Sequence, residues 1–279
     1  MIHTSTRVVL ALAIGFCSAA VAFAQGPSSP SGQEDDAVLK PAEPDFTLIN
    51  LPTSLRLPRF KSAFRVTHRF VRPLKCDECP NSLLADAFGI DNGALIGLEY
   101  RFGIVPNGEI VFYRSRTDRS IEFLGQYGIT RQNNQMPVEI SALAAVEGTN
   151  NFRDVYSPTL GLIVSRLVGE RGAIHVEPIW VHNSNLAPDV DDDDTFMVGL
   201  GGRLRIRPTV YLVGEFTPRV AGFRPGTTLG SFAIEKRLGG HIFQLNFSNS
   251  SGTTMRQIAE GAPNNDDWYM GFNISRKFF

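Results

Sequence analysis

The sequence predicts an all-β protein, a single closed antiparallel up-and-down transmembrane β-barrel of about twelve strands. Three observations predict this fold. From residue 62 onward, apolar residues alternate with small or charged ones, which is the period of a β-strand. Many of the alternating runs span roughly 9 to 11 residues, the length that a tilted strand needs to cross a bilayer. Long and short connections alternate between the runs, as they do in outer-membrane barrels.

Composition alone suggests an ordinary soluble globule. The chain has 279 residues, a formal net charge of −1 and 43% hydrophobic residues, and its mean hydropathy is −0.06. A nearly neutral chain lacks the basic footprint of a dedicated nucleic-acid binder, so we expect no nucleic-acid partner. After the first 25 residues no run approaches about 18 uninterrupted apolar residues, which excludes a transmembrane helix there.

The amino terminus resembles a cleaved secretory signal. Arg7 supplies positive charge, an apolar stretch follows, and Ala22, Phe23 and Ala24 fit the small-x-small cleavage rule. We therefore expect residues 1–24 to be the signal peptide, cut before Gln25, and the protein to be exported by a Gram-negative cell. Residues 25–45 are rich in Pro, Ser, Gly and acidic residues and predict a flexible leader. Residues 46–279 are then the barrel domain.

The strands are expected where alternation persists. In residues 94–102, for example, one face carries only apolar residues and the other carries Gly97, Glu99 and Arg101 together with Leu95. The same analysis predicts strands at 62–71, 94–102, 109–117, 120–129, 137–147, 156–166, 172–182, 195–206, 209–219, 228–237, 241–249 and 267–279.

The polar face of these strands separates a membrane barrel from a soluble sandwich. A sandwich needs only strands of about 5 to 6 residues, whereas an apolar exterior with aromatic residues near strand ends suits a bilayer. Such a barrel would enclose the charged residues, either as a salt-bridged lumen or as a surface that attracts anions. The expected lumen charges are Arg65, Arg69, Glu99, Arg101, Glu139, Glu177, Arg203, Arg205, Glu215 and Glu235.

The connections give the barrel an orientation. With the amino terminus on the periplasmic side, the outer loops fall at 72–93, 118–119, 148–155, 183–194, 220–227 and 250–266. The inner turns fall at 103–108, 130–136, 167–171, 207–208 and 238–240. Apart from 118–119, the outer connections are the longer ones.

Two cysteines remain after removal of the signal, Cys76 and Cys79. In an oxidising compartment a local disulfide is the favoured interpretation, and a metal-binding pair is the alternative. Haem attachment would require His at position 80, where Pro80 stands, and no second ligand pair for zinc follows. We expect no metal and no cofactor.

Several short motifs resemble a family of bacterial outer-membrane β-barrel proteins of unknown function. The most specific are His68, Arg69 and Phe70 on the first strand and Gly239, Gly240 and His241 near the end. The resemblance covers about residues 60 to 279 and implies a fold and an outer-membrane address, without any activity. The terminal Phe279 resembles the signal that the barrel-assembly machinery recognises, so that machinery and outer-membrane lipid are the expected partners.

Three functions follow from these observations. The leading hypothesis is an outer-membrane barrel that is not an enzyme, with a passive-transport role for a small solute or a structural role. The second is a surface lipid hydrolase, because His182 and Ser184 lie in a run similar to that of outer-membrane phospholipase A. The third is a soluble periplasmic β-barrel that holds a small ligand.

Overall fold

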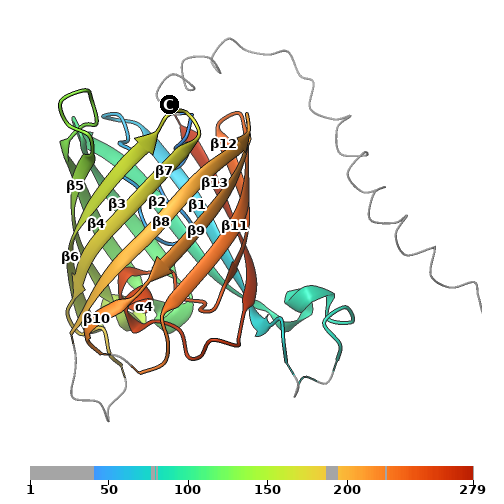
Figure 1. Cartoon of the computed structure of the whole chain (residues 1–279). Coiled ribbons are helices and arrows are strands. Elements are labelled where there is room, and N and C mark those ends of the chain that lie inside the picture. The colour runs from blue at the N-terminus through green and yellow to red at the C-terminus, as the bar shows by residue number, and fades with distance from the viewer. Residues whose placement is uncertain (1–40, 77–78, 80, 187–193, 224, 279) are drawn as a thin grey trace, which may run out of the picture.

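The computed structural model describes residues 41–76, 79, 81–186, 194–223 and 225–278, which form a β-barrel (Figure 1). The expected cleavage site, most of the expected leader and Phe279 lie outside the described residues. The strands are β1 (Ser62–Pro73), β2 (Ala94–Val105), β3 (Gly108–Ser115), β4 (Ile121–Thr130), β5 (Glu139–Gly148), β6 (Asp154–Val168), β7 (Gly172–Val181), β8 (Thr195–Arg207), β9 (Val210–Thr217), β10 (Arg219–Gly222), β11 (Leu229–Leu238), β12 (His241–Ser248) and β13 (Tyr269–Phe278).

The strands form one closed antiparallel sheet. Each strand from β1 to β7 pairs with the next, and β1 also pairs with β13. The order continues from β13 through β12 and β11 to β9, and pairing between β9 and β8 closes the ring. The sheet has thirteen strands, but β10 continues β9 beyond Pro218, so the ring is twelve strands around. The predicted all-β closed barrel is confirmed, and the strand expected at 209–219 is divided at a proline that cannot donate to the ladder.

The outward face of the barrel is apolar. Phe64, Leu98 and Tyr100 are exposed on β1 and β2, while Arg65 and Glu99 between them are buried. This alternation continues around the ring, so a neutral mean hydropathy hides two faces of opposite character.

The two ends of the barrel differ in their connections. At the end we call the turn end, 106–107, 208–209 and 239–240 join neighbouring strands, and the last strand also finishes there. At the opposite end, the loop end, longer segments such as 74–93 and 249–268 join the strands. The loop end carries short helical segments, η2 (Ala87–Asn92), η3 (Thr117–Arg119), α3 (Thr149–Phe152) and α4 (Met255–Glu260). Among the described residues, no helix is long and apolar enough to cross a membrane.

The last residues of the expected leader, 42–45, lie inside the barrel. Residues 41–57 enter the barrel from the turn end, turn back inside it and lead into β1. Within the part of the leader that the structure describes, Glu43 is completely buried and Asp45 nearly so. Composition predicted flexibility there, but contacts with the barrel wall order these residues. We call residues 41–57 the lumen hairpin.

Candidate functional site

The lumen is filled by two segments that approach from opposite ends. The lumen hairpin enters from the turn end, and α4 lies inside the loop end (Figure 1). Their apolar side chains meet inward-facing wall residues in one buried cluster. It includes Leu48, Ile49 and Leu51 of the hairpin and Met255 and Ile258 of α4, packed against wall residues such as Val111, Leu124, Leu143, Ile163, Ile179 and Met197. Alternation had suggested a uniformly polar interior, but the interior also contains this apolar cluster.

The lumen hairpin is closed by its own backbone. The Leu48 amide donates to the Leu51 carbonyl at 2.8 Å, and the Thr53 amide donates to the Phe46 carbonyl at 2.9 Å. Thr47 and Pro52 form an antiparallel bridge. The hairpin contributes no strand to the barrel ladder, so it could leave without breaking any strand pairing.

The tip of the hairpin rests on one carboxylate. The backbone amides of Ile49, Asn50 and Leu51 all donate to Glu215 Oε1, at 2.6, 2.8 and 2.9 Å. The Asn50 side-chain amide donates to Glu215 Oε2 at 3.2 Å. Convergent amides on one buried oxygen form an anion-binding nest, and these charge-assisted bonds are the stronger kind.

Wall side chains also meet the carbonyl groups of the hairpin tip. Arg203 Nη2 donates to the Thr47 carbonyl at 2.8 Å, Gln244 Nε2 to Leu48 at 2.7 Å and Asn273 Nδ2 to Ile49 at 3.0 Å. Because buried backbone groups require partners, the polar lumen-facing residues satisfy a segment that has no sheet of its own.

The His-Arg-Phe motif contributes to both faces of β1. Arg69 points inward and donates to Asn50 Oδ1 of the hairpin at 2.9 Å and to Asn273 Oδ1 at 2.8 Å. His68 stacks on Phe272 with ring centroids 4.5 Å apart, and Phe70 meets its edge. Only Arg69 among the three touches the hairpin.

Glycines shape the wall around the hairpin. A Cβ atom at Gly201 would overlap Leu48 Cδ1, and one at Gly199 would come within 2.9 Å of Leu51 Cδ1. At the base of the hairpin, a Cβ at Gly103 would overlap the Pro58 carbonyl oxygen. We call the space left by Gly199 and Gly201 on β8 the glycine notch. It admits two leucine side chains that any larger wall residue would displace.

The returning arm of the hairpin meets polar groups of β3 to β6. Ser54 Oγ hydrogen bonds to Ser165 Oγ, and Arg56 Nε lies 3.2 Å from Glu139 Oε1. The Leu57 amide donates to Glu109 Oε2 at 3.0 Å. This arm therefore brings one guanidinium group and one amide to acidic groups of the wall.

Asp45 anchors the entering arm near the turn end. Its carboxylate accepts from Ser275 Oγ at 2.6 Å and lies 3.2 Å from Lys277 Nζ. Burial alone would raise the pKa of Asp45, but the Lys277 ammonium group and the Ser275 hydroxyl outweigh it and hold that pKa below its ordinary value.

α4 is fixed at the loop end by capping and by a buried cation. Thr254 and Gln257 form a reciprocal capping box, and the Met255 amide donates to Glu122 Oε2 at 2.8 Å. Arg256, fully buried, lies 2.9 Å from Glu147 Oε1 and also bonds to Asp118.

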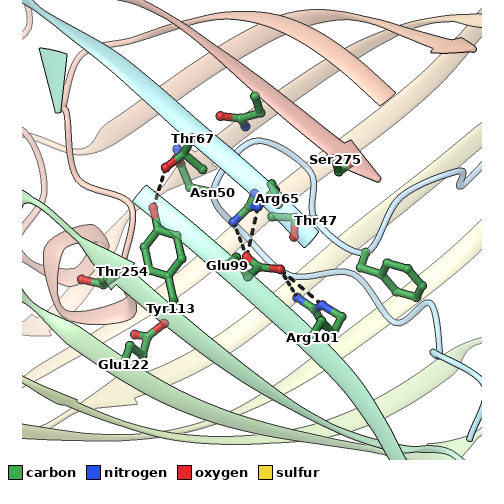
Figure 2. Close-up of polar contacts among 12 residues, drawn as sticks. Thr47, Asn50, Arg65, Thr67, Glu99, Arg101, Tyr113, Glu122, Thr254 and Ser275 are labelled. Carbon is green, nitrogen blue, oxygen red and sulfur yellow. Dashed lines mark hydrogen bonds and ion pairs between the residues drawn. The ribbon is translucent and has the colours of Figure 1, made fainter. Parts of the chain in front are cut away.

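The two inserted segments leave little free space between them. A cavity of about 20 Å³ is lined in part by Thr47 and Asn50 of the hairpin, Thr253 before α4, Met255 of α4 and Tyr113 of the wall. Figure 2 shows this region, where Thr67 hydrogen bonds to Tyr113 and Arg65 and Arg101 flank Glu99. A cavity of this size holds about one water molecule and has no room for a larger solute.

Most of the expected lumen charges are buried inside the barrel. Arg65 Nη2 lies 2.7 Å from Glu99, which also contacts Arg101 at 3.2 Å, and Arg203 lies 3.1 Å from Glu235. Arg205 is the exception. It lies near the turn end, where it is half-exposed and donates to the Pro208 carbonyl.

Glu177 differs from the other lumen carboxylates. It is completely buried, and neither of its oxygens has a hydrogen-bond partner. Its neighbour two residues away, His175, lies 3.1 Å from Glu43 of the hairpin.

The candidate hydrolase residues are held in separate contacts. His182 Nδ1 lies 2.5 Å from Asp194 Oδ1, and Trp180 Nε1 donates to the other oxygen of Asp194 at 3.2 Å. Ser184 is completely buried, and its Oγ lies 2.7 Å from Thr195 Oγ1. The structure thus pairs His182 with a carboxylate and Ser184 with a threonine.

The remaining expected residues lie at the two ends. Cys76 and Cys79 are joined in a disulfide within the loop from β1 to β2, with Cα atoms 5.4 Å apart. Gly239, with φ of 57°, and Gly240 form the turn before His241, whose ring accepts from Arg276 at 2.7 Å. Neither group touches the lumen hairpin through any of these contacts.

Comparisons with known proteins concern both the sequence family and the fold. No curated protein matches the chain in sequence. The KdgM porin is 7% identical, with a TM-score of 0.50 over 78% of this chain and 99% of the porin. The NanC porin is 8% identical, with a TM-score of 0.49 and the same two coverages. An outer membrane channel from Pseudomonas putida F1 is 12% identical, with a TM-score of 0.45 over 80% of this chain and 97% of the channel.

The porin comparison with a TM-score of 0.50 supports the barrel fold itself. A sequence model of one family covers most of the chain, from residue 45 to residue 278. This protein therefore belongs to the family described as membrane bound beta barrel domain (DUF5777).

Proposed function

We propose that this protein is an outer-membrane channel for small solutes that the lumen hairpin holds closed. The observation that carries the proposal is the hairpin itself, a segment outside the sheet ladder that occupies a wall shaped by Gly199 and Gly201. The expected signal peptide and the short turns at one end support an outer-membrane address with the turn end in the periplasm. Lipid would cover the apolar outward face.

The hairpin is the movable part of the closure. α4 is tied to the wall at both ends by β12 and β13, whereas the first arm of the hairpin continues toward the amino terminus. Withdrawal toward the turn end would expose Leu48, Ile49 and Leu51, each of which is buried. Burying each such side chain contributes about 1.5–3 kcal/mol, so the closed state dominates at rest.

The test is conductance across a planar bilayer. Leu48→Asp puts a carboxylate into the glycine notch and is expected to expel the hairpin, since an unpaired buried charge costs several kcal/mol. Phe60→Asp adds the same charge at an exposed position between the hairpin and β1 and is the matched control. We expect sustained conductance from Leu48→Asp and a largely silent Phe60→Asp and wild-type protein.

A wall-side pair makes the test independent of the hairpin's own residues. Gly201→Leu fills the notch, whereas Gly214→Leu, on the neighbouring strand, meets open space. Conductance from Gly201→Leu and not from Gly214→Leu supports the channel. If Leu48→Asp and Gly201→Leu insert into the bilayer as folded barrels and both remain silent, the proposed function is wrong.

A further inference from the structure

Two carboxylates flank the glycine notch. Glu177 on β7 is in register with Gly199 on β8, and Gly201 on β8 is in register with Glu215 on β9. All four residues lie on the inward face of their strands. The strands that carry the carboxylates are two spacings apart, roughly 10 Å. The floor between the carboxylates has no side chains, so this part of the wall is a shallow acidic recess when the hairpin is absent.

In the closed state the hairpin occupies this recess with hydrogen-bond donors. Three backbone amides and the Asn50 side chain converge on Glu215, so the tip presents partial positive charge to it. Leu51 lies against Gly199, next to Glu177. Glu215 is thereby satisfied and Glu177 is not.

The Glu177 side chain is a buried carboxylate that no group among the described residues satisfies. It is completely buried, and both of its oxygens lack a hydrogen-bond partner. A buried carboxylate without a partner is costly, and such a group in a native structure requires an explanation. A cationic group that enters after the hairpin leaves would supply the missing partner.

Several neighbouring basic residues have partners of their own on the wall. Arg203 keeps its partner Glu235 on the wall, and Arg65 keeps Glu99, whether or not the hairpin is present. Lys277 loses Asp45 when the hairpin leaves, but it lies near the turn end. Two further bases face the lumen: Arg69 is held by Asn273, and His175, two residues from Glu177, loses Glu43 when the hairpin leaves.

The returning arm of the hairpin also carries a positive charge that leaves the lumen with it. Its Arg56 forms an ion pair with Glu139, so withdrawal removes this cation from the wall. The opened lumen therefore loses one cation, and Glu215 loses the donors of the hairpin tip while Glu177 stays without a partner among the described residues.

We propose that the opened channel selects cationic solutes and that Glu177 and Glu215, on either side of the glycine notch, bind their ammonium or guanidinium groups. This inference rests on the proposed channel function and names the class of solute. Carboxylates aimed into a low-dielectric passage concentrate cations and repel anions.

The experiment measures reversal potentials of the full-length Leu48→Asp variant in a KCl gradient, followed by replacement of K⁺ on one side with guanidinium. We expect the reversal potential to shift toward the equilibrium potential of K⁺, as in a cation-selective channel. After the replacement we expect a measurable guanidinium current. Adding Glu177→Gln and Glu215→Gln should shift the reversal potential toward zero. Glu170→Gln, which removes one charge from an exposed turn, is the control and should leave it unchanged.

The outcomes separate this inference from the function on which it rests. A conducting Leu48→Asp channel with a reversal potential at zero, or of the sign set by Cl⁻, overturns cation selection and leaves the channel intact. Selectivity for K⁺ that persists in the double Gln variant overturns the assignment to Glu177 and Glu215. A folded, inserted variant with no current overturns the channel and, with it, this inference.

Discussion

At the scale of single residues, Glu215 is the wall residue that accepts hydrogen bonds from the tip of the lumen hairpin. It accepts from three consecutive backbone amides and from the Asn50 side chain. Hydrogen bonds to a charged partner contribute roughly 1.5–3 kcal/mol each, against about 1 kcal/mol for neutral ones. The ionised carboxylate therefore matters more than the shape of the side chain.

Replacing this charge should loosen the hairpin. We expect Glu215→Gln to cost about 1.5 kcal/mol and to raise the open fraction roughly tenfold. Ser54→Cys supplies the probe, because Ser54 is completely buried and a thiol there reacts with a maleimide only after the hairpin moves. Labelling of Ser54→Cys should accelerate about tenfold in the Glu215→Gln background. Equal labelling rates, with Glu170→Gln as the control background, would mean that the tip contact does not hold the hairpin.

The sequence located many of these residues but not their roles. Period-two alternation placed Glu215, Arg69 and Arg203 on the inward face, and that face is buried. It could not reveal that Glu215 binds the hairpin, because Asn50 and Glu215 are separated by 165 positions. The sequence could not reveal the role of the inward glycines for the same reason. Gly199 and Gly201 matter only because the distant residues Leu51 and Leu48 pack against them.

At the scale of elements, the strands were predictable and the two inserted segments were not. A strand carries its own periodic signal, but the lumen hairpin has neither a long alternating run nor a helical one. α4 has six residues, too few for a helical period to be visible. Its capping box, Thr254 and Gln257, is a local signal that the sequence did contain.

α4 depends on one buried cation. Arg256 lies within 3.3 Å of Glu147 and Glu260 and also bonds to Asp118. Removing one partner of a buried ion pair typically costs about 3–5 kcal/mol, because the other charge is left buried without compensation. We expect Arg256→Gln to reduce the stability of the protein in detergent by about this amount, measured by denaturant unfolding.

An exposed arginine nearby is the control for that measurement. Arg119→Gln removes only a 3.4 Å hydrogen bond to Asn150 at the surface, so its effect should stay within about 0.5 kcal/mol. Similar losses from Arg119→Gln and Arg256→Gln would show that the buried contacts of α4 do not stabilise the fold.

At the scale of the whole molecule, the barrel and its closure come from one pattern of alternation. Outward apolar residues meet the membrane, while inward residues form a template for the chain's own amino-terminal segment. The neutral composition thus conceals an apolar exterior and a lumen filled with paired charges and a small apolar core. The number of strands and the alternation of connections followed from the sequence, but whether the lumen was open or filled did not.

The central claim is that the lumen hairpin closes a channel. A disulfide can test it, because Ser54 on the hairpin and Ser165 on β6 are in hydrogen-bond contact, and cysteines so placed are close enough to be joined. The conductance of Leu48→Asp/Ser54→Cys/Ser165→Cys tests the claim most directly. The single-cysteine variants in the same background control for the reductant, which can also act on Cys76 and Cys79.

The oxidised protein, with its hairpin tied to the wall, should be silent, and reduction should restore the current of Leu48→Asp. The single-cysteine variants should conduct in both redox states. An oxidised protein whose cross-link is complete by mass and which still conducts, or a reduced protein that stays silent, would contradict the account.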